Sequence, residues 1–247
     1  MGRWSRPVAA QFLHWLAPSP GSRWLDAGCG TGVLSGSILL HTAPAFITGL
    51  DFSARFVEYA RKQYGGQHVT FCASDAGALP LENDSFDTAV CGLALNFFPQ
   101  PETAVAEMAR VTRSGGQVAA YVWDYAEGMQ MLRLFWDTAV SLDPAAEELD
   151  EGRRFPLCRP QPLADLFERA GLPAVQTRAI EVPTRFIDFY DYWRPLLGGV
   201  GPVPGYIAGL TEDARAALKE RLRELLPLAG DGSISLLARA WAVRGVA

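Results

Sequence analysis

Hydrophobic positions follow two alternating spacings through the first half of the chain. Short runs of consecutive apolar residues are typical of buried strands, and the longer segments between them repeat apolar residues every three to four positions, as helices do. The predicted strands cover residues 23–28, 46–51, 69–72, 86–93 and 117–123, and the predicted helices cover residues 8–16, 31–41, 53–64 and 101–111. Helices of this length between strands make right-handed crossovers. The pattern therefore predicts a mostly parallel, doubly wound α/β sheet with helices on both faces.

The regular alternation stops after residue 123, although single elements can still be recognised. Helical spacing returns at residues 129–142, 161–170 and 211–226, and strands are expected at residues 174–182 and 233–243. These two strands bring the predicted sheet to seven.

The organisation of the chain follows from where this pattern is interrupted. A Ser-Gly-Gly turn at residues 114–116 is expected to precede the fifth strand. Residues 125–160 and 184–210 follow the fifth and sixth strands, and we expect them to form small helical insertions that cap a substrate. The sequence thus predicts a single domain over residues 1–247, with residues 22–124 as its cofactor-binding core.

Composition and charge narrow the class of ligand. Hydrophobic residues make up 49% of the chain and charged residues 20%, as in folded globular proteins. The net charge of −5 argues against a nucleic acid as the main substrate, because binding a phosphate backbone depends on a basic surface. No apolar run approaches the ~18 residues that span a bilayer, so no membrane span is expected. A small molecule is the better default.

Cysteine and histidine positions give no sign of a metal site or of disulfides. Cys29, Cys72, Cys91 and Cys158 are scattered, and three of them lie in apolar runs, which is typical of reduced thiols in a cytoplasmic protein. The three histidines are isolated from one another, so no metal centre is predicted. The sequence leaves the oligomeric state open.

One turn carries most of the chemical information. The stretch LDAGCGTG, residues 25–32, follows the first predicted strand and places glycine at every second position behind Asp26. The spacing G-x-G-x-G differs from the dinucleotide-binding G-x-G-x-x-G because residue 33 is valine, and no Gly-Lys-Ser/Thr follows as in a P-loop. A carboxylate at Asp26 would also repel a pyrophosphate by roughly 1 to 4 kcal/mol at 4 Å. Asp51 ends the second strand, where a carboxylate can bind ribose hydroxyls. The turn therefore suits a nucleoside that carries a cationic arm.

Four motifs in order resemble one known family. LDAGCGTG is followed by GLDFSARFVEYAR, by SDAGALPLENDSFDTAV and by ETAVAEMARVTRSGGQVAAYVW. Together they resemble the class I S-adenosylmethionine-dependent methyltransferases, above all the small-molecule group that includes the ubiquinone and menaquinone biosynthesis enzymes. The resemblance implies a Rossmann-like fold, S-adenosyl-L-methionine as cofactor, and methyl transfer to an O, N or C atom of a small-molecule acceptor.

The resemblance also implies which residues bind the cofactor. They belong to the turn, to the next strand ends and to the N-terminal segment: Asp26, Gly28, Gly30, Gly32, Asp51, Phe52, Asp75, Ala76, Leu93 and Arg6. The glycines would admit the methionine and ribose portion, and Asp26 would face the ammonium through water. Asp51 would bind the ribose hydroxyls, and Phe52 would lie against the adenine.

The remaining assignments concern the adenine amino group and the methionine chain. Asp75 would accept a hydrogen bond from the adenine amino group, with the Ala76 N–H nearby, and residues 93–96 would run along the methionine chain. Arg6 or Arg3 would pair with the carboxylate of the cofactor.

The acceptor side is less defined. Candidates at the fourth and fifth strand ends are Asn96, Trp123, Asp124 and Tyr125. Methyl transfer needs alignment more than a dedicated catalytic residue, since the cofactor carries the driving force. A non-catalytic or regulatory cofactor-binding protein therefore remains an alternative, and an NAD-dependent oxidoreductase is a weaker one because of Asp26 and Val33.

Overall fold

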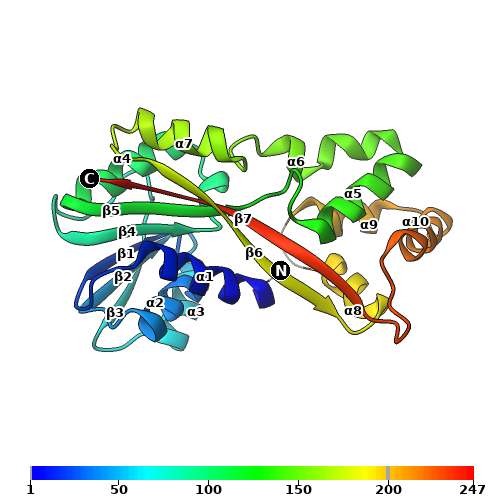
Figure 1. Ribbon diagram of the computed structural model, residues 1–247, viewed down its shortest axis with the longest axis horizontal. Coiled ribbons are helices and arrows are strands. Elements are labelled where there is room, and N and C mark those ends of the chain that lie inside the picture. Colours follow the sequence, from blue (N-terminus) through cyan, green and yellow to red (C-terminus); the bar gives the residue numbers. More distant parts are fainter. Residues whose placement is uncertain (1, 199–200) are drawn as a thin grey trace. The chain divides into compact units, whose positions relative to one another are not determined.

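The computed structural model describes residues 2–198 and 201–247. Its strands form a seven-stranded sheet in the order β3-β2-β1-β4-β5-β7-β6 (Figure 1). The strands are β1 (Arg23–Ala27), β2 (Phe46–Asp51), β3 (Val69–Ala73), β4 (Phe86–Gly92), β5 (Thr112–Trp123), β6 (Gln176–Phe186) and β7 (Ile234–Val246). β1 runs parallel to both β2 and β4, and the pairs β2–β3 and β4–β5 are also parallel. The predicted doubly wound sheet is confirmed.

β7 runs in the opposite direction to β5. The Gly115 N–H donates to the Ala247 carbonyl oxygen at 2.8 Å, and the Ala247 N–H donates to the Gly116 carbonyl oxygen at 3.0 Å. The end of β7 thus pairs with the beginning of β5, so an otherwise parallel sheet carries an antiparallel strand at this position.

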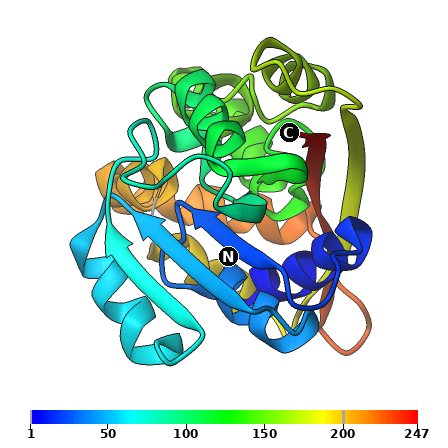
Figure 2. The same cartoon turned by 90° about the vertical axis from the view of Figure 1, so that its left-hand side faces the viewer.

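Helices follow most strands, as the spacing predicts. They are α1 (Gly2–Leu16), α2 (Val33–His41), α3 (Ala54–Tyr64), α4 (Pro101–Val111), α5 (Gln130–Leu142), α6 (Glu151–Arg154), α7 (Pro160–Arg169), α8 (Phe189–Trp193), α9 (Pro202–Gly209) and α10 (Glu212–Leu225), with short 3₁₀ turns η1 (Leu95–Phe97), η2 (Pro144–Leu149) and η3 (Arg194–Leu197). α1 packs on α2, and α4 packs on α7 (Figures 1 and 2). α1, α2 and α3 cover one face of the sheet, and α4 and α7 cover the other.

Local sequence explains where two of these helices begin. Ser53 precedes α3, and its hydroxyl accepts a hydrogen bond from the Phe56 N–H at 3.3 Å. The Thr211 hydroxyl accepts from the Ala214 N–H at 3.2 Å and caps α10 in the same way. Each cap satisfies a backbone donor that has no partner inside the helix.

The start of β5 differs from the sequence prediction. The Ser-Gly-Gly segment at residues 114–116 belongs to the strand, which already begins at Thr112. The register of β4 against β5 shifts between Phe86 and Thr88, and Gly115 has a φ of +76°. Glycines that suit a turn also suit an irregular strand start, and pairing with β4 and β7 decides between them here.

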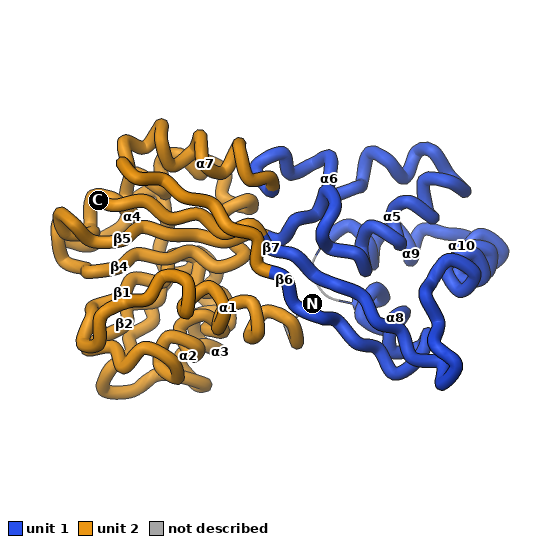
Figure 3. The backbone as a smooth tube through the Cα atoms, in the orientation of Figure 1, with its two compact units in different colours: residues 1, 123–158, 181–240 blue, residues 2–122, 159–180, 241–247 orange. Residues whose placement is uncertain are grey.

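The chain divides into two compact units, drawn in different colours in Figure 3. Unit 1 contains residues 123–158 and 181–240, and unit 2 contains residues 2–122, 159–180 and 241–247. Each has its own buried aromatic core, with Phe135 and Trp136 in unit 1 and with Trp24, Phe71 and Tyr121 in unit 2.

The first expected insertion, residues 125–160, contains α5, η2 and α6, and the second, residues 184–210, contains α8, η3 and α9. Both are helical, as predicted. That they cap a substrate within one domain stays a prediction. Among the described residues, no helix has the length and apolar character needed to cross a bilayer.

Candidate cofactor site

The carboxyl ends of β1, β2 and β3 place the predicted cofactor residues along one edge of the sheet. The parallel register pairs Ala27 with Leu50, and Asp51 with Ala73. The turn after β1, Asp51 at the end of β2, and Asp75 beyond β3 therefore follow neighbouring strand ends, where ligands bind in sheets of this kind.

The glycine turn is held by backbone hydrogen bonds and by Asp51. The N–H groups of Gly28 and Cys29 both donate to the Leu50 carbonyl oxygen, at 2.7 and 2.9 Å. Asp51 Oδ2 accepts from the Gly30 N–H at 2.8 Å, and its Oδ1 accepts from the Ser53 N–H at 2.8 Å. Asp51 thus ties the turn to the beginning of α3, and each oxygen keeps a lone pair for a ligand.

The three glycines of the turn have different surroundings. A Cβ at Gly28 would lie 2.8 Å from the Ala94 Cβ, and one at Gly32 would lie 2.8 Å from a ring carbon of Tyr64. A Cβ at Gly30 would meet no atom within 4 Å. All three have positive φ, which favours glycine. Gly28 and Gly32 therefore allow close packing inside the protein, and Gly30 faces open space that a ligand can use.

Asp26 is a buried carboxyl group with only one hydrogen-bond partner in the described part of the chain. Its exposed fraction is 0%, and its Oδ2 accepts from the Ser35 hydroxyl at 2.6 Å. Oδ1 is buried without a partner. The pKa of Asp26 is raised to about 7, chiefly by burial; hydrogen bonds from Ser35 oppose the shift, and the negative charge of Asp51 adds to it.

The groups around Asp26 confirm that this region is poor in positive charge. Burial, and next the negative charge of Asp26, raise the pKa of Cys29 and of Cys91. The same two causes raise the pKa of Tyr121. A neutral thiol or phenol does not stabilise a buried carboxylate as a cation would.

Residues farther along the sheet edge are more exposed. Phe52 is 87% exposed, and Asp75 is exposed, with its Oδ1 accepting from the Gly77 N–H at 2.8 Å. Ala76 is half-buried. These positions leave room for a flat ring system and a polar group, as expected for an adenine.

The segment after β4 is tightly constrained. Leu93 has a φ of +58°, and its N–H donates to the Tyr121 carbonyl oxygen at 2.8 Å. Asn96 lies in η1, and its Nδ2 is buried without a hydrogen-bond partner in the described structure. An unpaired amide donor at a strand end is a group that a ligand could satisfy.

The acceptor-side candidates after β5 lie in unit 1 and are buried, at 2 to 4% exposure. Asp124 Oδ2 accepts from Arg239 Nε at 2.7 Å, and its Oδ1 accepts from the Glu127 N–H at 3.0 Å. The Tyr125 ring lies 5.7 Å from that of Phe155, and burial raises its pKa. Asp124 and Tyr125, like Trp123, thus have packing or pairing roles within unit 1. Their part in acceptor binding stays a prediction.

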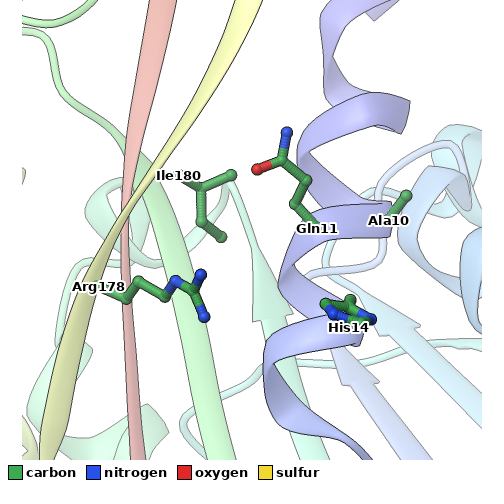
Figure 4. A pocket seen from close by; sticks show the side chains of 5 residues that line it. All are labelled: Ala10, Gln11, His14, Arg178 and Ile180. Atoms are coloured by element: carbon green, nitrogen blue, oxygen red, sulfur yellow. The ribbon is translucent and has the colours of Figure 1, made fainter.

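Arg6, the predicted partner of the cofactor carboxylate, is exposed on α1 in unit 2. A separate hollow of about 250 Å³ is lined by Ala10, Gln11, His14, Arg178 and Ile180, between α1 and β6 (Figure 4). None of the predicted cofactor residues lines it.

Sequence reasoning missed two groups of this site. Ser35 is the only hydrogen-bond partner of Asp26 among the described residues, and the Tyr64 ring fills the space beside Gly32. A signal for Ser35 was present, because a serine two residues into an apolar helix requires a polar partner. Tyr64 gave no such signal, since its position depends on how α3 packs.

The chain is similar to known proteins in both sequence and fold. Residues 25–120 match the family model described as a methyltransferase domain. The chain is similar to the class I S-adenosylmethionine-dependent methyltransferases. The methyltransferase domain match begins within β1, so it includes Asp26 and the whole glycine turn.

Curated relatives of the chain differ in how much of it they match. It is 32% identical over 111 residues to a ubiquinone/menaquinone biosynthesis C-methyltransferase UbiE of Ruegeria sp., covering 43% of the chain and 44% of that relative. It is 28% identical to a malonyl-[acyl-carrier protein] O-methyltransferase of Herminiimonas arsenicoxydans, covering 90% and 83%. The alignments with the first two curated relatives thus span less than half of either relative's length.

Solved structures extend the similarity over the whole methyltransferase fold. Phosphoethanolamine N-methyltransferase 2 of Haemonchus contortus, solved with phosphomonomethylethanolamine and S-adenosylhomocysteine, is 16% identical with a TM-score of 0.60. The match covers 96% of this chain and 52% of that one. At this identity the likeness establishes the fold.

Proposed function

We propose that the protein transfers a methyl group from S-adenosyl-L-methionine to a small-molecule acceptor. The observation that carries the proposal is the buried Asp26 carboxyl, which has an unpaired oxygen beneath a glycine turn. A buried carboxylate favours a ligand with positive charge and disfavours a pyrophosphate. The match of residues 25–120 to a methyltransferase domain supports the same ligand.

The residues present fit this cofactor. The unpaired Oδ1 of Asp26 suits its ammonium, the open space at Gly30 suits close approach of its methionine and ribose portion, and Asp51 has lone pairs for two ribose hydroxyls. The exposed ring of Phe52 would cover the adenine, and Asp75 would accept from its amino group.

Further contacts are proposed around these. Gly28 and Gly32 shape the turn, the Ala76 N–H lies next to Asp75 in sequence, and Leu93 continues toward the methyl-transfer point. Arg6 would bind the cofactor carboxylate. Arg6 is an exposed side chain on α1, so its guanidinium is accessible to a ligand.

Once bound, S-adenosyl-L-methionine supplies an electrophilic methyl group. The chain's own contribution would be to hold cofactor and acceptor in line and to exclude water. The Asn96 amide, whose Nδ2 is buried without a hydrogen-bond partner among the described residues, would donate a hydrogen bond to a ligand atom. A base is needed only where the acceptor must lose a proton.

The acceptor is proposed only as a small molecule. The named relatives include C-, O- and N-methyltransferases, which leaves the acceptor atom open. A cytoplasmic location and the absence of a nucleic-acid partner stay predictions from composition.

Calorimetry with S-adenosylhomocysteine tests the cofactor site. We expect micromolar binding to the native protein and at least tenfold weaker binding to Asp51→Ala. Asp87→Ala is the matched control, because Asp87 lies near the start of β4 and binds Arg23 and Arg113. Its affinity should equal that of the native protein. Unchanged affinity in Asp51→Ala would refute the ribose assignment.

A turnover assay separates the enzyme from the alternatives. Transfer of labelled methyl from the cofactor to a pool of metabolites is expected for the native protein. Cofactor binding without any labelled product would indicate a regulatory protein. Quenching of tryptophan fluorescence by NADH, without binding of S-adenosylhomocysteine, would indicate an oxidoreductase.

A further inference from the structure

Every titratable side chain that influences Asp26 in the described structure is acidic or neutral. Asp51 of β2 adds a negative charge, and the other groups are the thiols of Cys29 and Cys91 and the phenol of Tyr121. From α2, the uncharged hydroxyl of Ser35 donates a hydrogen bond to it. Among residues 2–198 and 201–247, no cation is therefore among the groups that shift the pKa of this carboxyl.

The protonation state of Asp26 is consequently balanced near neutral pH. Burial favours the neutral acid, and the hydrogen bond from Ser35 favours the ionised form. With a pKa of about 7, a large fraction of the ligand-free protein carries a proton on Asp26 at neutral pH. A cation bound beside the free Oδ1 would shift this balance toward the ionised form.

We propose that Asp26 determines specificity for a cationic ligand through its proton, which it releases when an ammonium group binds at the glycine turn. The O–H bond of the carboxyl breaks, the proton passes to the solvent, and the resulting carboxylate faces the ammonium. The inference rests on the proposed function, because it takes the methionine arm of the cofactor as the source of the ammonium.

Coupled proton release makes the affinity depend on pH in a defined way. Below pH 7 the ligand must displace the proton, so the affinity should rise about tenfold per pH unit between pH 5 and about 6.5. It should level off above pH 7 and fall again only at alkaline pH, where the α-ammonium group of the ligand loses its own proton. A fixed, ionised carboxylate would give no rise over the lower range.

Titration calorimetry of S-adenosylhomocysteine at pH 6.0, in buffers of different ionisation enthalpy, measures the release directly. The slope of observed heat against buffer enthalpy gives the number of protons released. It should be roughly 0.9 for the native protein, from a pKa of about 7. It should be near zero for Asp26→Asn, which keeps the shape and the Ser35 hydrogen bond.

A second pair of variants tests whether the Ser35 hydrogen bond sets the pH at which Asp26 ionises. Ser35→Ala removes the hydrogen bond that favours ionisation, so the break in the affinity profile should move to higher pH. Ser37→Ala is the matched control on the same helix, because its hydroxyl donates to the Val33 carbonyl oxygen at 2.9 Å. Its profile should match that of the native protein.

Ligand chemistry supplies an internal control. 5′-Methylthioadenosine has the nucleoside and sulfur of the cofactor and lacks the amino-acid arm, so its binding should release no proton. Infrared difference spectra of the native protein should show loss of a protonated carboxyl band with S-adenosylhomocysteine and not with 5′-methylthioadenosine.

The outcomes distinguish the inference from the proposed function. Binding of S-adenosylhomocysteine with zero slope, or with equal slopes in native protein and Asp26→Asn, would overturn the role of Asp26 and leave the cofactor assignment standing. Absence of any binding would overturn the proposed function and the inference with it.

Discussion

The buried aspartates of the two compact units differ in their partners. In unit 1, Asp124 pairs with Arg239 at 2.7 Å and Asp150 pairs with Arg133 at 2.8 Å. In unit 2, Asp26 has a serine hydroxyl as its partner and keeps one oxygen unpaired. Because an unpaired buried charge is costly, Asp124 and Asp150 are stabilised by arginines of their own unit, whereas Asp26 requires a cation from outside the described residues.

The largest expected effect comes from breaking an ion pair of unit 1. Arg239→Ala leaves the Asp124 carboxylate buried and uncompensated, which should lower the free energy of unfolding by about 3 to 5 kcal/mol. Denaturant titration measures this change. Arg221→Ala removes an exposed pair with Glu224 on α10 and should cost less than about 1 kcal/mol. Equal losses in both variants would remove the contrast between buried and exposed pairs.

Replacing Asp26 should have the opposite sign. The folded-state pKa is raised from 3.8 to about 7, so the folded protein binds more protons than the unfolded chain and loses stability as pH rises across that window. Asp26→Asn should therefore stabilise the ligand-free protein by up to about 4 kcal/mol at pH 8, with the gain shrinking toward pH 4. Thermal unfolding from pH 4 to 8 checks this. A destabilised variant at pH 8 would contradict it.

Alanine substitutions at Gly32 and Gly30 should separate the effect of packing from that of ligand binding within unit 2. Gly32→Ala brings a Cβ within 2.8 Å of the Tyr64 ring at a φ of +82°, and should cost about 2 kcal/mol of stability. Gly30→Ala meets no protein atom and should cost about 1 kcal/mol, through its positive φ alone. S-adenosylhomocysteine should bind at least tenfold more weakly to Gly30→Ala. Unfolding curves and calorimetry of both variants test the separation.

Much of the fold could be predicted from hydrophobic spacing. β2 and α4 have the predicted bounds, and α3 begins one residue later because Ser53 is its cap. The prediction that β5 begins at residue 117 was wrong, because Gly115 and Gly116 are compatible with both a turn and an irregular strand. Only the pairing with β7, which is distant in sequence, selects the strand.

The candidate site was predictable to the level of the strand ends. Parallel register alone brings the turn after β1 and Asp51 together. Burial of Asp26 and its bond to Ser35 depend on how α2 packs over β1, and the partners of Asp124 come from residues more than 100 positions away. Such long-range partners leave no local pattern in the sequence.

The division into two units limits how recombination can change this protein. The chain passes from one unit to the other between residues 122 and 123, 158 and 159, 180 and 181, and 240 and 241, and the last two crossings lie inside β6 and β7. No single junction can therefore exchange unit 1 for that of another protein. Recombination would have to preserve both strands across the join, so new acceptor preferences are reached more readily by point substitutions and short loop insertions than by shuffling.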